Sequence, residues 1–143
     1  MIQILLVEDN RDDEELTLLT LEENHIVNDV KVVRDGVEAL DYLFATGSYA
    51  QENHSLPDMI LLDVKLPRVN GIEVLARVKS DERTRKIPVV MLTSSREEPD
   101  IQRSYELGAN SYIVKPVDFD QFKDTIKRIG FYWQNLNVPP ANP

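Results

Sequence analysis

The sequence predicts a doubly wound α/β domain in which five parallel strands form one sheet and five helices cover its two faces. Five short apolar segments of strand length alternate with segments whose apolar residues have helical spacing. The strand segments are almost entirely apolar, which is typical of parallel strands that are buried on both faces. With 143 residues and 42% hydrophobic content, the chain is long enough to form one core of this kind.

Each predicted strand is a short run of apolar residues that is followed by a helical segment, so right-handed crossovers are expected. The first run stops where Glu8 and Asp9 interrupt it. The five predicted strands are residues 2–7, 30–33, 59–62, 89–92 and 112–114.

The predicted helices have apolar residues three or four positions apart. The first is centred on Leu16 and Leu19, and the next three are residues 37–44, 72–78 and 101–107. A fifth, longer helix is expected to begin at residue 119.

The last helix has its own start signal, because Asp118 is followed three residues later by Gln121, as in a capping box. It is expected to run to about Leu136. One face carries the apolar residues Phe122, Ile126, Ile129 and Trp133, which need no role beyond core packing.

Turn residues mark the connections between these elements. Asp35-Gly36, Asn70-Gly71 and residues 108–110 lie between periodic segments. Residues 46–56 form a longer polar connection, which is predicted to be a surface excursion. One domain is expected over residues 1–136, followed by a Pro-rich tail over residues 137–143 with no second domain.

Composition excludes several classes of partner. The formal net charge of −9 would repel a phosphate backbone, so nucleic acid is not expected as a partner. The absence of Cys suits a reducing compartment, and a cytoplasmic location is predicted. Glu8 and Asp9 interrupt the N-terminal apolar run too early for a signal peptide or a membrane span, so no membrane association is expected.

Polar residues follow four of the predicted strands at the point where each strand ends. They are Glu8 with Asp9, Asp63, Thr93 and Lys115. Ligands of an open parallel sheet bind outside the carboxyl ends of its strands, so these side chains are expected to form one site.

The acidic loop after the first strand would repel a bare phosphate and attract a cation. Carboxylate oxygens without Cys or a nearby His suit a hard ion, and Mg²⁺ is the predicted occupant. Asp63 can then act as a nucleophile toward phosphorus, while the metal and Lys115 neutralise charge and Thr93 donates a hydrogen bond. Asp63 follows an apolar run that should be buried, where a carboxylate needs a cation or donors.

The whole constellation resembles the receiver domains of two-component response regulators, over roughly residues 2–135. Five motifs in order carry the resemblance, and together they are far more specific than any one alone. They are Leu5-Leu6-Val7-Glu8-Asp9-Asn10; Leu61-Leu62-Asp63; Leu66-Pro67 with Asn70-Gly71; Val90-Met91-Leu92-Thr93; and Tyr112-Ile113-Val114-Lys115-Pro116.

The resemblance implies a flavodoxin-like strand order of 2-1-3-4-5 and a role for each motif residue. Asp63 would be the phosphoacceptor, and Thr93 and Lys115 would contact the phosphoryl oxygens. Asp9 would bind the metal directly and Glu8 through water. The Lys65 carbonyl would be a further ligand.

Two more features follow from the resemblance. The Lys115-Pro116 peptide is expected to be cis. Tyr112 is either a half-buried strand aromatic or a side chain that turns inward when Thr93 closes on the phosphoryl group, and both interpretations stay open.

The long connection before the third strand and the aromatic ending of the last helix resemble the single-domain regulators paired with cyanobacterial and bacterial phytochrome kinases. This implies a sensor histidine kinase as partner, with red and far-red light as its input, and a homodimer formed by the fourth and fifth helices and fifth strand. The interface residues expected are Ile101, Tyr105, Phe131, Tyr132 and Leu136.

Family analogy also places kinase docking on the first helix, at Leu16, Leu19 and Thr20, and on Pro116-Val117. The expected function is a phosphoryl-accepting switch that signals through protein contacts. It is not expected to be an enzyme beyond phosphorylating and dephosphorylating itself.

Two other functions are compatible with parts of this pattern. A metal-dependent phosphohydrolase also forms an aspartyl-phosphate, but such enzymes typically carry a second carboxylate two residues after the nucleophile, where this chain has Lys65. A degenerate receiver that acts only as a binding module would be expected to lack one of the site residues, and none is missing. His25 and His54 are predicted to be loop residues without a role.

Overall fold

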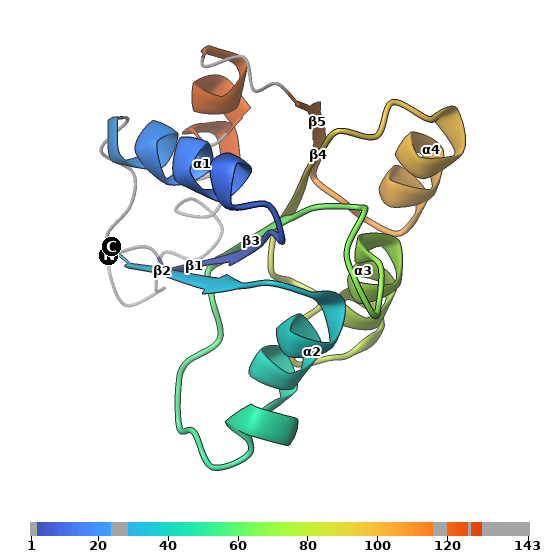
Figure 1. The fold of residues 1–143 in the computed structure, drawn as a ribbon. Coiled ribbons are helices and arrows are strands. Elements are labelled where there is room, and N and C mark those ends of the chain that lie inside the picture. Colours follow the sequence, from blue (N-terminus) through green and yellow to red (C-terminus); the bar gives the residue numbers. More distant parts are fainter. Residues whose placement is uncertain (1–2, 24–28, 116–119, 126, 130–143) are drawn as a thin grey trace, which may run out of the picture.

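The sheet contains five parallel strands in the order β2-β1-β3-β4-β5, as expected (Figure 1). The computed structural model describes residues 3–23, 29–115, 120–125 and 127–129. The strands are β1 Gln3–Val7, β2 Asp29–Val33, β3 Met59–Leu62, β4 Val89–Thr93 and β5 Ser111–Val114. Each predicted strand agrees with an observed one to within one residue at either end, because a polar residue follows each apolar run.

Helices cover both faces of the sheet (Figure 1). They are α1 Arg11–Glu23, α2 Gly36–Phe44, α3 Gly71–Ser80 and α4 Glu98–Glu106, with a short 3-10 turn η1 at Gly47–Tyr49. Residues 120–125 and 127–129 are also helical, which confirms a fifth helix. No helix in the described part of the chain is both long enough and apolar enough to cross a lipid bilayer.

Two apolar cores lie on opposite faces of the sheet. Leu43 of α2 and Leu75 of α3 pack in one core, while Leu21 of α1 and Phe122 of the fifth helix pack in the other. Alternate residues of the same strand point into different cores, as with Leu5 and its neighbours in β1. This burial on both faces explains why the strands read as continuous apolar runs.

The strand register brings the carboxyl ends of the strands together. Val7 is paired with Leu62, and Thr93 with Val114. The amide of Asp63 donates to the Val7 carbonyl at 3.2 Å, and that of Lys115 donates to the Thr93 carbonyl at 2.8 Å. The residues that follow each strand therefore meet at one edge of the sheet.

Turn residues start two of the helices. Asp35 caps α2 by accepting a hydrogen bond from the Glu38 amide, and Asn70 caps α3 by accepting from the Glu73 amide. Gly71 is required for a different reason, because a Cβ atom there would lie 1.9 Å from the backbone oxygen of Asp63. The start of α3 therefore packs directly against the backbone of a site residue.

The start of α4 was predicted wrongly. The helix begins at Glu98, three residues before the predicted start at residue 101, and it ends at Glu106. Its first turn contains Pro99 and acidic residues, which favour a helix N-terminus but give no apolar periodicity to detect.

The connection between α2 and β3 is better anchored than a polar surface excursion would be. Tyr49 is buried, and its ring meets that of Tyr42 edge to face at a centroid distance of 5.2 Å. His54 stacks on Tyr42 at 4.0 Å, and its Nε2 atom is 2.7 Å from the Tyr42 carbonyl oxygen. The prediction that His54 is merely a loop residue therefore missed its packing on α2.

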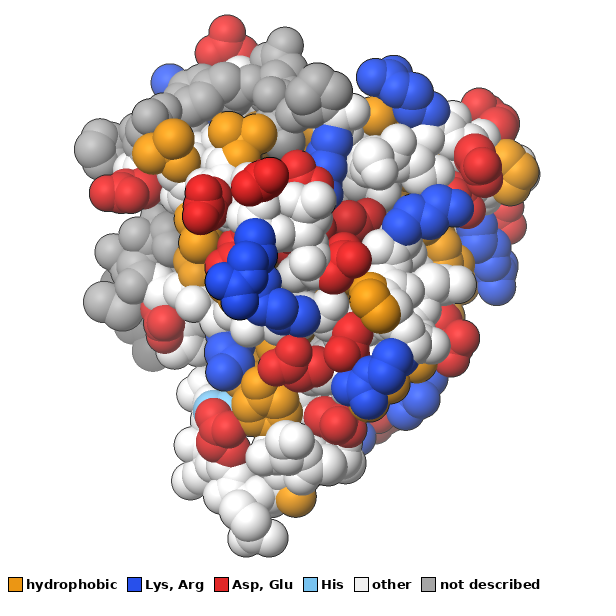
Figure 2. Space-filling view, viewed as in Figure 1, with side chains coloured by type: hydrophobic (Ala, Val, Ile, Leu, Met, Phe, Trp, Pro, Cys, Tyr) orange, Lys and Arg blue, Asp and Glu red, His pale blue; other side chains and the backbone are white. Residues whose placement is uncertain are grey.

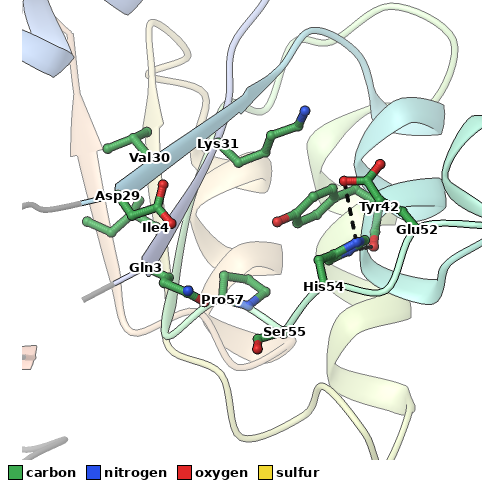
Figure 3. Close-up of a pocket in the computed structure, with 10 residues that line it drawn as sticks. All are labelled: Gln3, Ile4, Asp29, Val30, Lys31, Tyr42, Glu52, His54, Ser55 and Pro57. Atoms are coloured by element: carbon green, nitrogen blue, oxygen red, sulfur yellow. Dashed lines mark hydrogen bonds and ion pairs between the residues drawn. The ribbon is translucent and has the colours of Figure 1, made fainter. Parts of the chain in front are cut away.

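A pocket of about 190 Å³ lies beside this connection, at the end of the sheet where β1 and β2 begin (Figure 3). Tyr42 and His54 line one side of it, and Gln3, Asp29 and Lys31 from β1 and β2 line the other. It is therefore separate from the carboxyl ends of the strands.

Several predictions fall outside the described residues. They concern His25, Pro116-Val117, the cap residue Asp118, Ile126, Phe131, Tyr132, Trp133, Leu136 and the tail at 137–143. Of the predicted interface, Tyr105 on α4 is 50% exposed and Ile101 is partly buried. On α1, Leu16 and Leu19 are exposed whereas Thr20 is buried.

Candidate functional site

Four of the residues predicted to form one site lie together: Glu8, Asp9 and Asp63 form an acidic cluster, and Lys115 contacts two of them. Its Nζ atom lies 2.5 Å from Glu8 Oε1 and 3.1 Å from Asp63 Oδ2. Glu8 and Asp63 are buried, and the Lys115 side chain is only 9% exposed. Figure 2 shows acidic side chains gathered near the middle of the face seen in Figure 1, bordered by Lys and Arg side chains.

Asp13 also belongs to this cluster, although it was not predicted. Its Oδ2 atom accepts a hydrogen bond from Lys115 Nζ at 2.8 Å. Asp13 lies in the first turn of α1, where its amide donates to the side chain of Asn10 at 3.0 Å. Three consecutive acidic residues occupy this turn, and the sequence does not indicate which of them faces the sheet.

Burial and pairing act on the charges of this cluster in opposite directions. Burial raises the pKa of Glu8 to about 7, and the hydrogen bond from Lys115 offsets only part of that effect. For Lys115, burial acts to lower the pKa, but hydrogen bonds to Asp13 and Glu8 outweigh it and raise the pKa above its ordinary value. The lysine is therefore charged at neutral pH.

The acidic residues fit a hard divalent cation. One carboxylate oxygen from each of Glu8, Asp9 and Asp63 lies within 4.8 Å of the others, with Asp9 exposed and the other two buried. An all-oxygen donor set of this kind suits Mg²⁺, Mn²⁺ or Ca²⁺ better than a soft metal. These residues would hold the ion.

Lys65 contributes to the site through its backbone. Its amide donates to Asp63 Oδ1 at 3.1 Å, which fixes one oxygen of that carboxylate while Lys115 contacts the other. The Lys65 side chain is 61% exposed, and its Nζ atom lies 3.8 Å from Asp100 on α4. The role of its carbonyl as a metal ligand stays a prediction.

Thr93 and Tyr112 are linked through Ser95. The buried Thr93 hydroxyl accepts a hydrogen bond from the Ser95 amide at 3.2 Å, and the Tyr112 hydroxyl donates to the Ser95 carbonyl at 3.0 Å. Ser95 Oγ donates to Asp100 at 2.6 Å, which extends the chain of contacts to α4. Tyr112 is half-buried in this structure, and both interpretations of its role stay open.

The sequence matches a family model and curated proteins over most of its length. The model for the response regulator receiver domain matches residues 4–127. The chain is 42% identical over 138 residues to the probable methanogenesis regulatory protein FilR2 of Methanothrix harundinacea, covering 96% of this chain and 87% of FilR2. It is 38% identical to the response regulator Rcp1 of Synechocystis, covering 96% and 92% of the two proteins.

Solved structures agree with the sequence comparison. The bacteriophytochrome response regulator RtBRR superposes with a TM-score of 0.83 at 54% identity, covering 98% of this chain and 84% of RtBRR. The phosphorylated form of the cyanobacterial phytochrome response regulator RcpA gives 0.78 at 43% identity, covering 96% of each chain. The Mn²⁺-bound form of Rcp1 gives 0.79 at 36% identity, covering 93% of this chain and 94% of Rcp1.

Proposed function

This chain belongs to the response regulator receiver family, and from that premise we propose that it accepts a phosphoryl group from a sensor histidine kinase on Asp63. The observation that carries the proposal is the position of the Asp63 carboxylate. One of its oxygens accepts from the Lys65 amide and the other from the Lys115 ammonium. A nucleophilic carboxylate is thus held in a fixed orientation beside a positive charge.

Mg²⁺ is the proposed metal, held by Glu8, Asp9, Asp63 and the carbonyl of Lys65. Its chemistry when bound is to neutralise charge on the phosphoryl oxygens. The residues of the chain supply the rest. Lys115 provides a further positive charge, and the Thr93 hydroxyl provides a hydrogen-bond donor from the neighbouring strand.

The proposed switch runs from Thr93 to α4. When the Thr93 hydroxyl turns to a phosphoryl oxygen, it gives up its hydrogen bond from the Ser95 amide, and Tyr112 follows Ser95 inward. Asp100 is bonded to Ser95, so the same change reaches the first turn of α4. The exposed surface of that helix would then change its affinity for partner proteins.

The direct test is to incubate the pure protein with Mg²⁺ and acetyl phosphate and to weigh the intact protein, with Asp63→Asn as the control. We expect the mass of one phosphoryl group on the wild type and none on the variant. A wild type that gains no mass would exclude the proposal. Continuous turnover of an unrelated phosphate ester would instead support the hydrolase, which is not favoured because Lys65 stands where that class needs a carboxylate.

Red and far-red light is the proposed input, through a phytochrome kinase. The support is the similarity to RtBRR and RcpA, both described as phytochrome response regulators, although FilR2 is described as a methanogenesis regulator. Phosphotransfer from a purified bacterial phytochrome kinase, compared under red and far-red light, tests this. Equal transfer from an unrelated histidine kinase would argue against it.

A homodimer that uses the fourth and fifth helices and β5 is the proposed assembly, and a cytoplasmic location stays a prediction. Tyr105 supports the assembly because it is a large side chain that is half exposed on α4. Light scattering of the wild type and of Tyr105→Ala should show a dimer that the substitution weakens. A wild-type monomer with and without phosphorylation would exclude it.

A further inference from the structure

Lys115 has no hydrogen-bond donor left for a phosphoryl group. Its ammonium carries three N–H donors, and three carboxylates accept from it: Glu8 at 2.5 Å, Asp13 at 2.8 Å and Asp63 at 3.1 Å. A phosphoryl oxygen that binds Lys115 must therefore displace one of these carboxylates. The carboxylate that is displaced most easily therefore decides how readily Lys115 can bind the phosphoryl group.

The three acceptors differ in how easily they can leave. The Glu8 side chain is 1% exposed, so separation from the lysine would leave a buried polar group without its partner. Asp63 is 7% exposed and is the group that attacks phosphorus in the proposed reaction, so its contact with the lysine is needed to orient it before the transfer. Asp13 has a side chain that is 37% exposed and can turn from the lysine to water at little cost. Asp13 is therefore the acceptor that can be exchanged.

Asp13 is also held in place to make this contact. The Asn10 side chain caps the helix by accepting from the Asp13 amide, and the Glu14 amide donates to the Asn10 carbonyl at 3.0 Å. The N-terminus of α1 further stabilises a negative side chain in its first turn. The backbone position of Asp13 is thus fixed, and only its side chain needs to rotate.

We propose that Asp13 is a positioning residue that holds the Lys115 ammonium in the resting site and releases it to the incoming phosphoryl group. This rests on the proposed function of Asp63. In the transfer from acetyl phosphate, a bond forms between an Asp63 oxygen and phosphorus, the bond from phosphorus to the acetate oxygen breaks, and acetate leaves with that electron pair. One N–H of Lys115 then donates its hydrogen bond to a phosphoryl oxygen instead of to Asp13, and no proton is transferred between groups.

Removing the charge of Asp13 should therefore speed phosphorylation. Asp13→Asn replaces a charged acceptor with a weaker neutral one, so the lysine is freed at lower cost. We expect the initial rate of phosphorylation by acetyl phosphate to rise roughly fivefold, in keeping with a charge-assisted hydrogen bond at a partly exposed position. The rate is followed by intact mass at saturating Mg²⁺.

Asp12→Asn is the matched control, because Asp12 lies in the same turn, is exposed and carries the same charge. Equal acceleration by both variants would overturn the proposal, since it would show only reduced repulsion of an anionic donor.

The Lys115→Ala background gives a second control. Asp13→Asn should have no further effect there, and an undiminished effect would show that Asp13 does not act through Lys115.

A measurement on the metal-free protein tests the contact without phosphorylation. The ammonium protons of Lys115, observed by ¹⁵N NMR, should exchange with water faster in Asp13→Asn than in the wild type or Asp12→Asn. Unchanged exchange would overturn the proposal. A wild type that is never phosphorylated would instead overturn the proposed function, and the exchange experiment would still test the contact.

Discussion

Lys115 and Glu8 are 107 positions apart in the chain and form an ion pair at 2.5 Å that is almost wholly shielded from water. The pair joins the end of β5 to the end of β1 across the site. Because the same lysine also contacts Asp63, a cation that binds the carboxylates has to share them with an ammonium group. The first prediction follows from this competition.

Lys115→Met should bind divalent cations more tightly than the wild type. The substitution keeps most of the side-chain volume and removes the charge that competes for Glu8 and Asp63. We expect the dissociation constant for Mg²⁺ or Mn²⁺, measured by calorimetry, to fall about tenfold, or roughly 1.4 kcal/mol. Lys86→Met, at an exposed position, is the control, and weaker binding by Lys115→Met would contradict the prediction.

Gly71→Ala should destabilise the fold and disturb the position of Asp63. The new methyl group would lie 1.9 Å from the Asp63 backbone oxygen, so α3 or the end of β3 has to move. We expect a loss of about 2–3 kcal/mol in the free energy of unfolding by urea, together with slower phosphorylation. Glu73→Ala, exposed on the same helix, should leave both quantities nearly unchanged.

Tyr112→Phe should loosen the segment that leads into α4. It removes the hydrogen bond to the Ser95 carbonyl while keeping the ring in place. We expect a loss of about 1 kcal/mol in stability and faster amide exchange over residues 95–100. The control is Tyr105→Phe on the exposed face of α4, and protection of residues 95–100 equal to that of the wild type would contradict the expected link.

Tyr49 should make the protein less stable at high pH. Burial, followed by the hydrogen bond to Glu38, raises the pKa of Tyr49 to about 12 from 10.0. Between these values the unfolded chain loses the proton that the folded chain keeps, so stability falls as pH rises from about 10 to about 12. The fall in the urea midpoint over this range should be smaller in Tyr49→Phe, and an identical fall would show that other groups cause it.

The strands and the main site residues were predictable from the sequence for the same reason. A buried parallel strand is continuously apolar, so the polar residue that ends it, such as Asp63 or Thr93, is visible as a break. Because the strands are parallel, their carboxyl ends, and the polar residues that follow them, lie at the same edge of the sheet. The chemistry of the site follows from residue types at those breaks.

Other features had no comparable signal. Asp13 could not be distinguished from Asp12 because the direction of a side chain in a first helical turn depends on how the helix sits on the sheet. Tyr49 and His54 are isolated in a polar segment, so their packing on Tyr42 leaves no periodic pattern. The first turn of α4 is polar, so it has no apolar periodicity from which the start of the helix could be predicted.

The long sequence separations within the site bear on how the protein is made. Glu8 leaves the ribosome at the start of synthesis, yet β1 needs β3 as a neighbour, and Glu8 needs Lys115 as a counter-charge. A nascent chain that ends before residue 115 therefore carries the acidic cluster without the lysine that contacts it. The charges of the site are therefore balanced only after β5 has joined the sheet, which makes the pairing of β4 with β5 the step that completes the site.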